Sequence, residues 1–154
     1  MRKTGFILAT LTGMLAGLGF FVFNFGEGFS YFSEDPRTCI NCHVMQPHYD
    51  SWQKNVHHAF ATCNDCHMPA DSLVDKMIAK TVNGWNHSKA FTLDNYPEPI
   101  RITAYNAEIL QANCLRCHQD LVDTITFPHA GLGDPNHAVK CVSCHQDVGH
   151  GARW

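Results

Sequence analysis

The sequence predicts a mainly α-helical chain with much loop, made of one N-terminal membrane-spanning helix and one small domain. Two observations predict this fold class. The stretch from Thr4 to Gly26 carries no charged residue and has the length of a single membrane-spanning helix. In the rest of the 154-residue chain, one short Cys- and His-containing motif recurs four times, and the remaining length suits one compact domain.

The first 26 residues are predicted to form an uncleaved anchor. Arg2 and Lys3 precede the apolar stretch and only acidic residues follow it closely, which predicts the N-terminus in the cytoplasm and the rest outside. The alternative is a cleaved signal peptide, but such peptides have a shorter apolar core and a small-x-small cleavage site, which this segment provides poorly. Gly13 and Gly17 form a G-x-x-x-G pattern through which the anchors of a homodimer would pack.

All eight cysteines lie in C-x-x-C pairs, and a His directly follows each of the four pairs. C-x-x-C-H is the attachment signature of c-type haem, in which the thiols form thioethers and the His ligates the iron. A structural zinc module is the alternative, but zinc sites do not require that His. The sequence therefore predicts four covalently bound haem c groups. Their attachment residues are Cys39, Cys42, Cys63, Cys66, Cys114, Cys117, Cys141 and Cys144, followed by His43, His67, His118 and His145.

The spacing of the four motifs predicts two dihaem units. The first cysteines of motifs one and two are 24 residues apart (39 to 63) and those of motifs three and four 27 apart (114 to 141), against 51 between the pairs (63 to 114). The stretches HHAFATCNDCH and NHAVKCVSCH before and in the second motif of each pair are also alike. Residues 27–154 are therefore expected to form a tetrahaem cytochrome c domain in which the haems make up much of the core.

Three helices are expected in this domain. Ser72 followed by Asp75 fits a capping-box variant, which predicts a helix from about residue 73 whose apolar residues recur at helical spacing. That apolar stripe either packs in the core or lies at the lipid surface, with Lys76 and Lys80 at the headgroups. The other helices are expected from about Tyr49 to His58 and from about Pro99 to Asn113.

Electron-transfer haems generally have two axial ligands, so the motif histidines need partners. Repeat-related positions before motifs two and four, and the position five residues after His145, make His58, His137 and His150 the candidates. The other non-motif histidines His48, His57 and His129 are predicted to lie at the surface or beside a ligand.

Motif one carries a second candidate ligand, because Met45 lies two residues after His43. A thioether sulfur is a known axial ligand of haem iron. From spacing alone, either His43 binds the iron and Met45 packs beside it, or Met45 takes the place of the His.

Several stretches resemble the NapC/NirT/NrfH family of membrane-anchored multihaem quinol dehydrogenases: SEDPRTCINCHVMQP, CNDCHMP, NGWNHSKAFTL and CHQDVGHG, together with the anchor. The resemblance covers nearly the whole chain. It implies a bacterial cytoplasmic-membrane protein that draws on the membrane quinol pool, oxidises menaquinol and passes electrons through its haems to a periplasmic multihaem reductase. The implied partner is the pentahaem catalytic subunit of the ammonia-forming cytochrome c nitrite reductase.

The resemblance also implies site residues. Met45 matches a Met that ligates the first haem in place of the motif His, and His58 and His150 match distal ligands of later haems. Lys80 matches a Lys at the quinol pocket. His87 falls where some relatives have an Asp over the open face of haem one, so it either lines the quinol pocket or ligates that iron.

A Lys of the catalytic partner ligates one haem in this family. If a haem of this chain received that Lys, either His129 or His137 would not be needed as an axial ligand.

Three other functions fit part of the sequence. The first is a quinol dehydrogenase that serves a different periplasmic reductase. The second is a tetrahaem electron carrier released by signal cleavage. The third is an enzyme that itself reduces nitrite or hydroxylamine. The last is disfavoured because the chain has no C-x-x-C-K motif and is short for a substrate cavity among four haems. The role implied is thus the quinol-oxidising subunit of a reductase complex. The sequence has no basic run that would predict nucleic-acid binding, and its formal net charge is −3.

Overall fold

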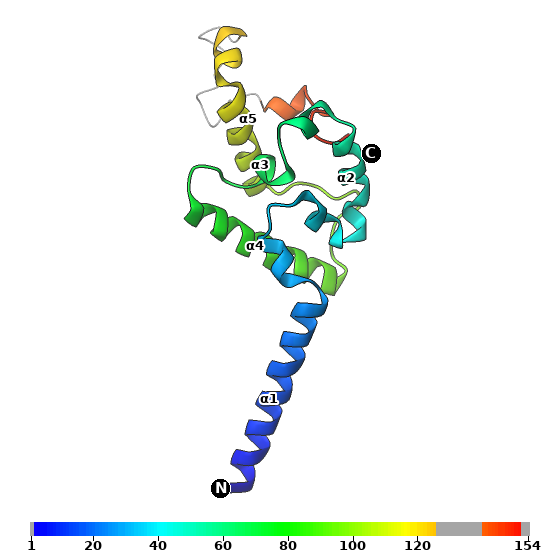
Figure 1. Cartoon of the computed structure of the whole chain (residues 1–154), viewed down its shortest axis with the longest axis vertical. Helices are drawn as coiled ribbons and strands as arrows, with labels where there is room; N and C mark the ends of the chain where they lie inside the picture. Colours follow the sequence, from blue (N-terminus) through cyan, green and yellow to red (C-terminus); the bar gives the residue numbers. More distant parts are fainter. Residues whose placement is uncertain (1, 126–139, 152–154) are drawn as a thin grey trace. The chain divides into compact units, whose positions relative to one another are not determined.

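The computed structural model describes residues 2–125 and 140–151, and the chain divides into two compact units, Met1–Ser33 and Glu34–Trp154 (Figure 1). The described residues form helices and 3₁₀ turns and no strand, which confirms the mainly helical fold class. The α-helices are α1 (Arg2–Phe25), α2 (Gln46–Gln53), α3 (Cys63–His67), α4 (Leu73–Leu93) and α5 (Ala104–Ile125). The 3₁₀ turns are η1 (Gly28–Phe32), η2 (Pro36–Asn41), η3 (His43–Met45), η4 (Val56–Ala59) and η5 (Cys141–Ser143).

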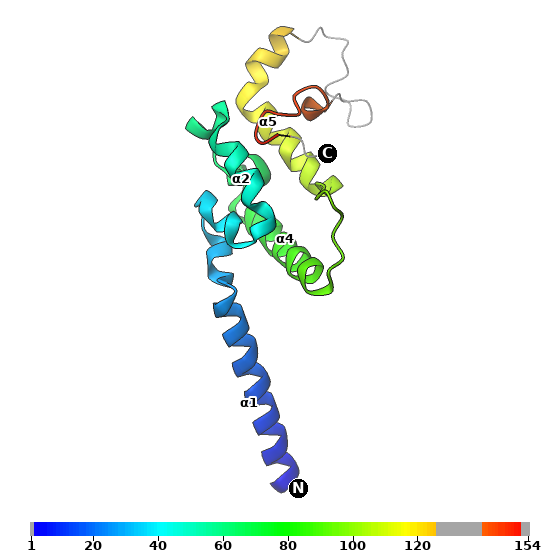
Figure 2. The same ribbon diagram turned by 90° about the vertical axis from the view of Figure 1, so that its right-hand side faces the viewer.

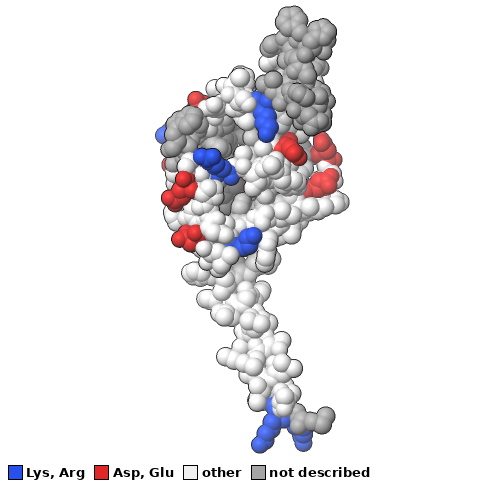
Figure 3. All heavy atoms as spheres, turned by 180° about the vertical axis from the view of Figure 1, so that it is seen from behind, with Lys and Arg blue, Asp and Glu red and all other residues white. Residues whose placement is uncertain are grey.

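Helix α1 has the properties of a membrane anchor. It spans 24 residues with a mean hydropathy of 2.1, which is long and apolar enough to cross a membrane. Thr10 and Asn24 donate side-chain hydrogen bonds to carbonyls four residues earlier, so these polar groups are satisfied within the helix. Figure 3 shows an uncharged helix surface except at the N-terminal end, where basic residues gather. The predicted N-terminal apolar helix is confirmed.

A tight turn ends the anchor. Glu27 adopts the left-handed conformation with φ of 52°. The next residue must be small, because a Cβ at Gly28 would overlap the Phe23 ring. Phe23 also packs edge-on against Phe29, with 4.9 Å between ring centroids. The chain therefore leaves α1 through an aromatic-lined turn within the first unit, and the second unit begins at Glu34.

Helix α4 begins where the sequence predicts. The Ser72 Oγ accepts a hydrogen bond from the backbone N–H of Asp75 at 3.3 Å, which caps the helix. One face of the helix is buried at Ala79, Lys80 and Asn83. The opposite face carries exposed apolar side chains, so the helix separates a polar buried face from an apolar accessible one.

The helix predicted from Tyr49 to His58 is wrong in both bounds. Helix α2 runs from Gln46 to Gln53, and the separate turn η4 follows it. The early end is explained by Asn55, whose side chain accepts a hydrogen bond from the backbone N–H of His57 at 3.1 Å and starts a new turn. Asn competes in this way with the backbone bonds of a continuing helix.

The helix predicted from Pro99 to Asn113 starts later and ends later. Helix α5 begins at Ala104, where the Thr103 Oγ1 accepts a hydrogen bond from the Asn106 N–H at 3.3 Å. The helix then continues through motif three to Ile125, so that motif is helical from end to end.

Hydrogen bonds from α5 hold two other motifs in place. The Asn113 Nδ2 donates to the carbonyls of Cys66 and Met68 at 3.0 and 2.8 Å, which fixes the end of α3 against α5. The Gln111 Oε1 accepts from the Cys141 N–H at 2.9 Å. Figure 2 shows the segment from residue 140 folded back beside α5. Motifs two, three and four therefore meet along one helix.

Residues near α2 hold the described C-terminal segment. The Asn55 Nδ2 donates to the Asp147 carbonyl at 2.7 Å, and the Gly151 N–H donates to the Ser51 Oγ at 2.8 Å. These bonds join positions 92 and 100 residues apart in the sequence. They bring the residues after motif four next to the residues before motif two.

Replacing Asn113 by Ala tests this framework. Asn113 is 7% exposed and its side chain makes two hydrogen bonds, so its removal takes away the donor to two half-buried carbonyls. We expect a loss of about 1–3 kcal/mol in the free energy of unfolding. Guanidinium unfolding followed by far-UV circular dichroism measures it. Glu108→Ala, at an exposed position of the same helix, is the control, and equal stability of the two variants would contradict the assignment.

Candidate functional site

The C-x-x-C-H motifs lie on helical turns. Motif two forms α3, and Thr62 caps it through a reciprocal box in which Thr62 N donates to Asp65 Oδ2 at 2.8 Å and Asp65 N to Thr62 Oγ1 at 3.4 Å. A helical turn brings residues three and four apart to one side, so both cysteines and the His of motifs two and three share a face. Motif one differs, because Cys42 is extended between the turns η2 and η3. All eight cysteines are described and none forms a disulfide, which leaves every thiol available for thioether attachment.

Contacts between cysteines show which motifs are neighbours. The Cys39 and Cys63 thiols are hydrogen-bonded to each other, which places motif one beside motif two. The Cys114 and Cys141 thiols interact in the same way, which places motif three beside motif four. This pairing agrees with the two predicted units. Cys66 also lies close enough to Cys117 for their charges to interact, so motifs two and three are neighbours as well.

A half-buried histidine cluster surrounds the motif-two His. The ring centroids of His67 and His150 are 6.0 Å apart with planes inclined by 11°, and the His48 ring lies 4.8 Å from His150. Burial, together with the nearby His150 and His48, lowers the pKa of His67 to about 4. The ring is therefore neutral at pH 7, the form that ligates metals.

The separation of His67 and His150 suits a shared iron. With metal–nitrogen bonds of about 2 Å, two imidazoles on opposite sides of one iron have centroids roughly 6 Å apart. The sequence singled out His150 as a distal ligand and predicted His48 at the surface or beside a ligand. In the structure, His48 lies beside the candidate ligand His150.

The motif-three His118 has a second histidine beside it. The ring of His57 lies 6.1 Å from that of His118, whereas the ring of His58 packs edge-on against Trp52 at 4.6 Å. Of the two adjacent histidines, His57 is therefore the one beside the motif-three His. Repeat spacing could not distinguish two adjacent histidines. The local signal was Asn55, whose cap sets the direction of the turn.

The two candidate ligands of motif one differ in exposure. Met45 is half-buried, and its N–H donates to the Cys42 carbonyl at 2.8 Å, whereas His43 is exposed. His145 of motif four is also exposed. The predictions for His129 and His137 fall outside the described residues.

A carboxylate and two lysines form a cluster beside motif one. The Lys80 side chain is 3% exposed, and its Nζ lies 3.0 Å from Glu34 Oε1. The Lys76 Nζ lies 2.8 Å from Glu34 Oε2, and the Asn64 Nδ2 donates to the same oxygen at 3.1 Å. The hydrogen bond with Cys63 is the main cause that lowers the pKa of the Cys39 thiol, and the charge of Lys80 adds to it, so the cluster adjoins the first motif.

The cluster also changes the acidity of its carboxylate. Desolvation raises the pKa of Glu34, but the hydrogen bonds from Lys76 and Lys80 outweigh it, and the resulting pKa lies below the ordinary value. Glu34 is therefore ionised at neutral pH. No residue of this cluster other than Lys80 was part of the predicted site.

His87 lies on the same side of α4 as Lys80, two helical turns further on. Its side chain is accessible, yet neighbouring groups desolvate the ring and lower the pKa of His87. A neutral imidazole accepts a proton, so this residue is suited to act as a general base.

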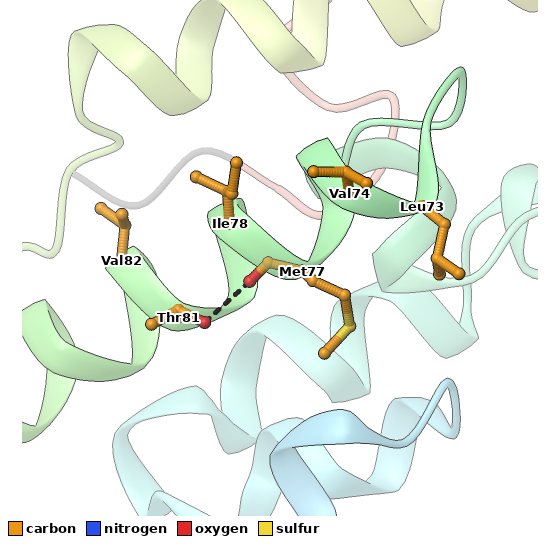
Figure 4. A pocket seen from close by; sticks show the side chains of 6 residues that line it. All are labelled: Leu73, Val74, Met77, Ile78, Thr81 and Val82. Atoms are coloured by element: carbon orange, nitrogen blue, oxygen red, sulfur yellow. Dashed lines mark hydrogen bonds between the residues drawn. The ribbon is translucent and has the colours of Figure 1, made fainter.

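The other face of α4 carries an apolar groove of about 470 Å³ (Figure 4). Val74, Ile78 and Val82 lie in a row at a spacing of four residues, and the Thr81 hydroxyl donates to the Met77 carbonyl at 2.8 Å. Because that hydroxyl is satisfied within the helix, the groove offers an apolar surface. Such a surface suits a flat apolar group. Its lining residues are Leu73, Val74, Met77, Ile78, Thr81 and Val82.

Comparisons with known proteins agree with the motifs. The family model of the NapC/NirT cytochrome c family, N-terminal region, matches residues 1–153. The chain is 40% identical to the cytochrome c-type protein NrfH of Wolinella succinogenes, covering 98% of this chain and 90% of that protein. It is 29% identical to the cytochrome c nitrite reductase subunit NrfH of Nitratidesulfovibrio vulgaris, covering 80% and 71%.

A solved structure is also similar. A chain in the crystal structure of the cytochrome c nitrite reductase NrfHA complex bound to the HQNO inhibitor matches with a TM-score of 0.62 and 25% identity. The match covers 94% of this chain and 90% of that one.

The Glu34 cluster predicts a pH dependence of stability. The folded-state pKa of Glu34 lies below its ordinary value of 4.5, so its contribution is present above about pH 4.5 and is lost as the pH falls through the folded-state pKa. We expect the stability difference between wild type and Glu34→Gln to be largest near neutral pH and to shrink below about pH 4.5.

Guanidinium unfolding at several pH values, followed by far-UV circular dichroism, measures the difference. Glu108→Gln, which removes an exposed carboxylate from α5, controls for the loss of one charge. A stability difference for Glu34→Gln that stays constant with pH would contradict the expected linkage.

Proposed function

The chain belongs to the NapC/NirT cytochrome c family, and we propose that it is a membrane-anchored tetrahaem cytochrome c that oxidises menaquinol. It passes the electrons to the pentahaem catalytic subunit of an ammonia-forming cytochrome c nitrite reductase. The observation that carries this proposal is the 40% identity to a NrfH protein over 98% of the chain. The likeness to a chain of the NrfHA complex supports the same partner.

The chain offers attachment and ligand residues for four haems. Each C-x-x-C pair supplies two thioether sulfurs, and the bound haems supply one-electron redox chemistry. The 6.0 Å between the rings of His67 and His150, and the 6.1 Å between those of His118 and His57, support these as two axial pairs. His57 thus replaces His58 in the proposed ligand set.

The remaining ligands follow the family resemblance. Met45, half-buried beside motif one, is the proposed ligand of haem one in place of His43. For the motif-four His145, the second ligand is either His137 or a Lys of the catalytic partner.

The order of the motifs supports a linear path for electrons. Motif one lies beside motif two, motif two beside motif three, and motif three beside motif four. Haems attached at these motifs would therefore carry electrons from motif one to motif four in sequence order. The chain is the quinol-oxidising, electron-transfer subunit of the complex, and nitrite is reduced in the catalytic partner.

Lys80 and His87 are the proposed quinol-contacting residues. The oxidation of a quinol releases two electrons and two protons, so the pocket needs a group that orients the hydroxyl and a base that takes a proton. The Lys80 ammonium, paired with Glu34, is a hydrogen-bond donor that orients the quinol oxygen. A ring nitrogen of His87, with its lowered pKa, accepts the proton. In this proposal His87 lines the pocket and does not ligate haem one.

The proposed location is the bacterial cytoplasmic membrane. The charges before and after α1 support a single uncleaved span with the haem domain in the periplasm. A Cβ at Gly13 or Gly17 would meet nothing within 4 Å in this chain, so the G-x-x-x-G face is open to the anchor of a second copy. A homodimer through this face is part of the proposal.

Quinol-driven haem reduction tests the proposed function. The purified membrane protein with attached haems should be reduced by a menaquinol analogue, as followed by its visible absorption, and no reduction would refute the proposal. Lys80→Gln should lower the rate on the order of tenfold, because a charged donor to the quinol is lost. Lys89→Gln, at an exposed position of the same helix, should reduce like wild type.

Affinity purification of the tagged chain from native membranes identifies the electron acceptor. Co-purification of a pentahaem nitrite reductase supports the proposed partner. Co-purification of a different multihaem reductase would replace that partner and leave the quinol dehydrogenase role intact.

Axial ligation distinguishes His57 from His58. His57→Ala should remove one axial ligand and convert one haem from the low-spin to the high-spin state, which electron paramagnetic resonance detects. His58→Ala is the matched control, since the same side chain is lost one residue away, and it should leave all haems unchanged. The reverse result would restore His58 as the ligand.

A further inference from the structure

The carboxylate of Glu34 is bonded to three side chains from two other parts of the fold. Its Oε1 lies 3.0 Å from the Lys80 Nζ, and its Oε2 lies 2.8 Å from the Lys76 Nζ and 3.1 Å from the Asn64 Nδ2. Two of the donors come from α4, and the third lies in the motif-two helix α3. We propose that Glu34 is a positioning residue that fixes the Lys80 ammonium for quinol binding. This inference rests on the proposed function.

The two oxygens of Glu34 make different contacts. Lys76 and Asn64 together hold Oε2, which leaves Oε1 directed at Lys80. Lys76 and Lys80 are one helical turn apart, so a single carboxylate that contacts both also fixes the rotation of α4 about its axis. The ammonium of Lys80 is thereby constrained through its own bond and through the helix that carries it.

The burial of Lys80 makes its ion pair with Glu34 energetically important. Lys80 is 3% exposed, and a buried ammonium without a partner is costly, whereas the Glu34 side chain is 56% exposed. The carboxylate therefore meets the buried charge from the solvent side. Without Glu34, the Lys80 ammonium either stays buried without this ion pair or moves toward water.

The sequence position of Glu34 links the contact to the first two motifs. Glu34 is the first residue of the second unit and precedes Cys39 by five residues, and Asn64 directly follows Cys63. The Cys39 and Cys63 thiols are themselves in contact. Glu34 therefore ties α4 to the site where haems one and two would attach, which sets the location of the Lys80 ammonium relative to haem one.

Two measurements on the full-length membrane protein with attached haems test this inference. The first is the steady-state rate of haem reduction against the concentration of a menaquinol analogue. Glu34→Gln should raise the KM about three- to tenfold and change kcat less, because the binding donor is displaced while the haems are intact. Glu108→Gln, an exposed carboxylate on α5, should match wild type.

A double-mutant cycle separates positioning from a general structural effect. If Glu34 acts through Lys80, Glu34→Gln should have little further effect in the Lys80→Gln background. Equal effects of Glu34→Gln in both backgrounds, or an unchanged KM in the single variant, would overturn the inference.

The second measurement does not depend on quinol. Amine acetylation followed by mass spectrometry should label Lys80 several-fold faster in Glu34→Gln than in wild type, because the ammonium loses its ion pair with Glu34. Unchanged labelling overturns the inference even where the proposed function holds. Wild-type protein that quinol fails to reduce refutes the proposed function and this inference with it, whereas normal wild-type reduction with an unaffected Glu34→Gln refutes the inference alone.

Discussion

The second unit is held together by hydrogen bonds between side chains and distant backbone groups. Within the described residues, Ala79 is the one hydrophobic side chain that is buried, so apolar packing among the protein's own side chains contributes little. Asn113, Gln111 and Asn55 instead join segments that are far apart in the sequence. A domain proposed to enclose four porphyrins would have few buried apolar side chains of its own, because the cofactors would fill its centre. The motifs are therefore held by hydrogen bonds to neighbouring segments.

The scarcity of buried apolar side chains also explains why the polar side chains of Lys80 and Asn83 lie in the interior. Lys80 and Asn83 are more deeply buried than nearly every apolar residue of the described chain, and both lie on the face of α4 opposite the apolar groove. Asn83 is satisfied by reciprocal hydrogen bonds with Asn106 at 3.2 and 2.9 Å. Lys80 is satisfied by Glu34. The helix thus uses polar pairs to dock on the protein and keeps its apolar face accessible.

The sequence predicted the features that local residues determine. The anchor follows from an uncharged run, and the start of α4 follows from the cap at Ser72. The other helix bounds were wrong because Asn55 and Thr103, single residues without a strong pattern, decide where turns begin. Contacts that join distant residues were beyond sequence reasoning. Glu34 is 42 and 46 residues from its two lysines, and nothing in the spacing of these residues indicates the contact.

The arrangement of the motifs gives the chain a direction. Lys80 lies close enough to affect the Cys39 thiol, and Cys39 belongs to the motif that neighbours motif two. The contacts then continue from Cys66 to Cys117 and from Cys114 to Cys141. Lys80, the buried cation proposed to orient a quinol, therefore lies at one end of this series, and motif four lies at the other. Two electrons released at the first motif would reach the fourth only through the motifs between them. A small domain is enough to separate the proposed quinol site from the electron acceptor, because haems attached at the four motifs in series would span the distance between them.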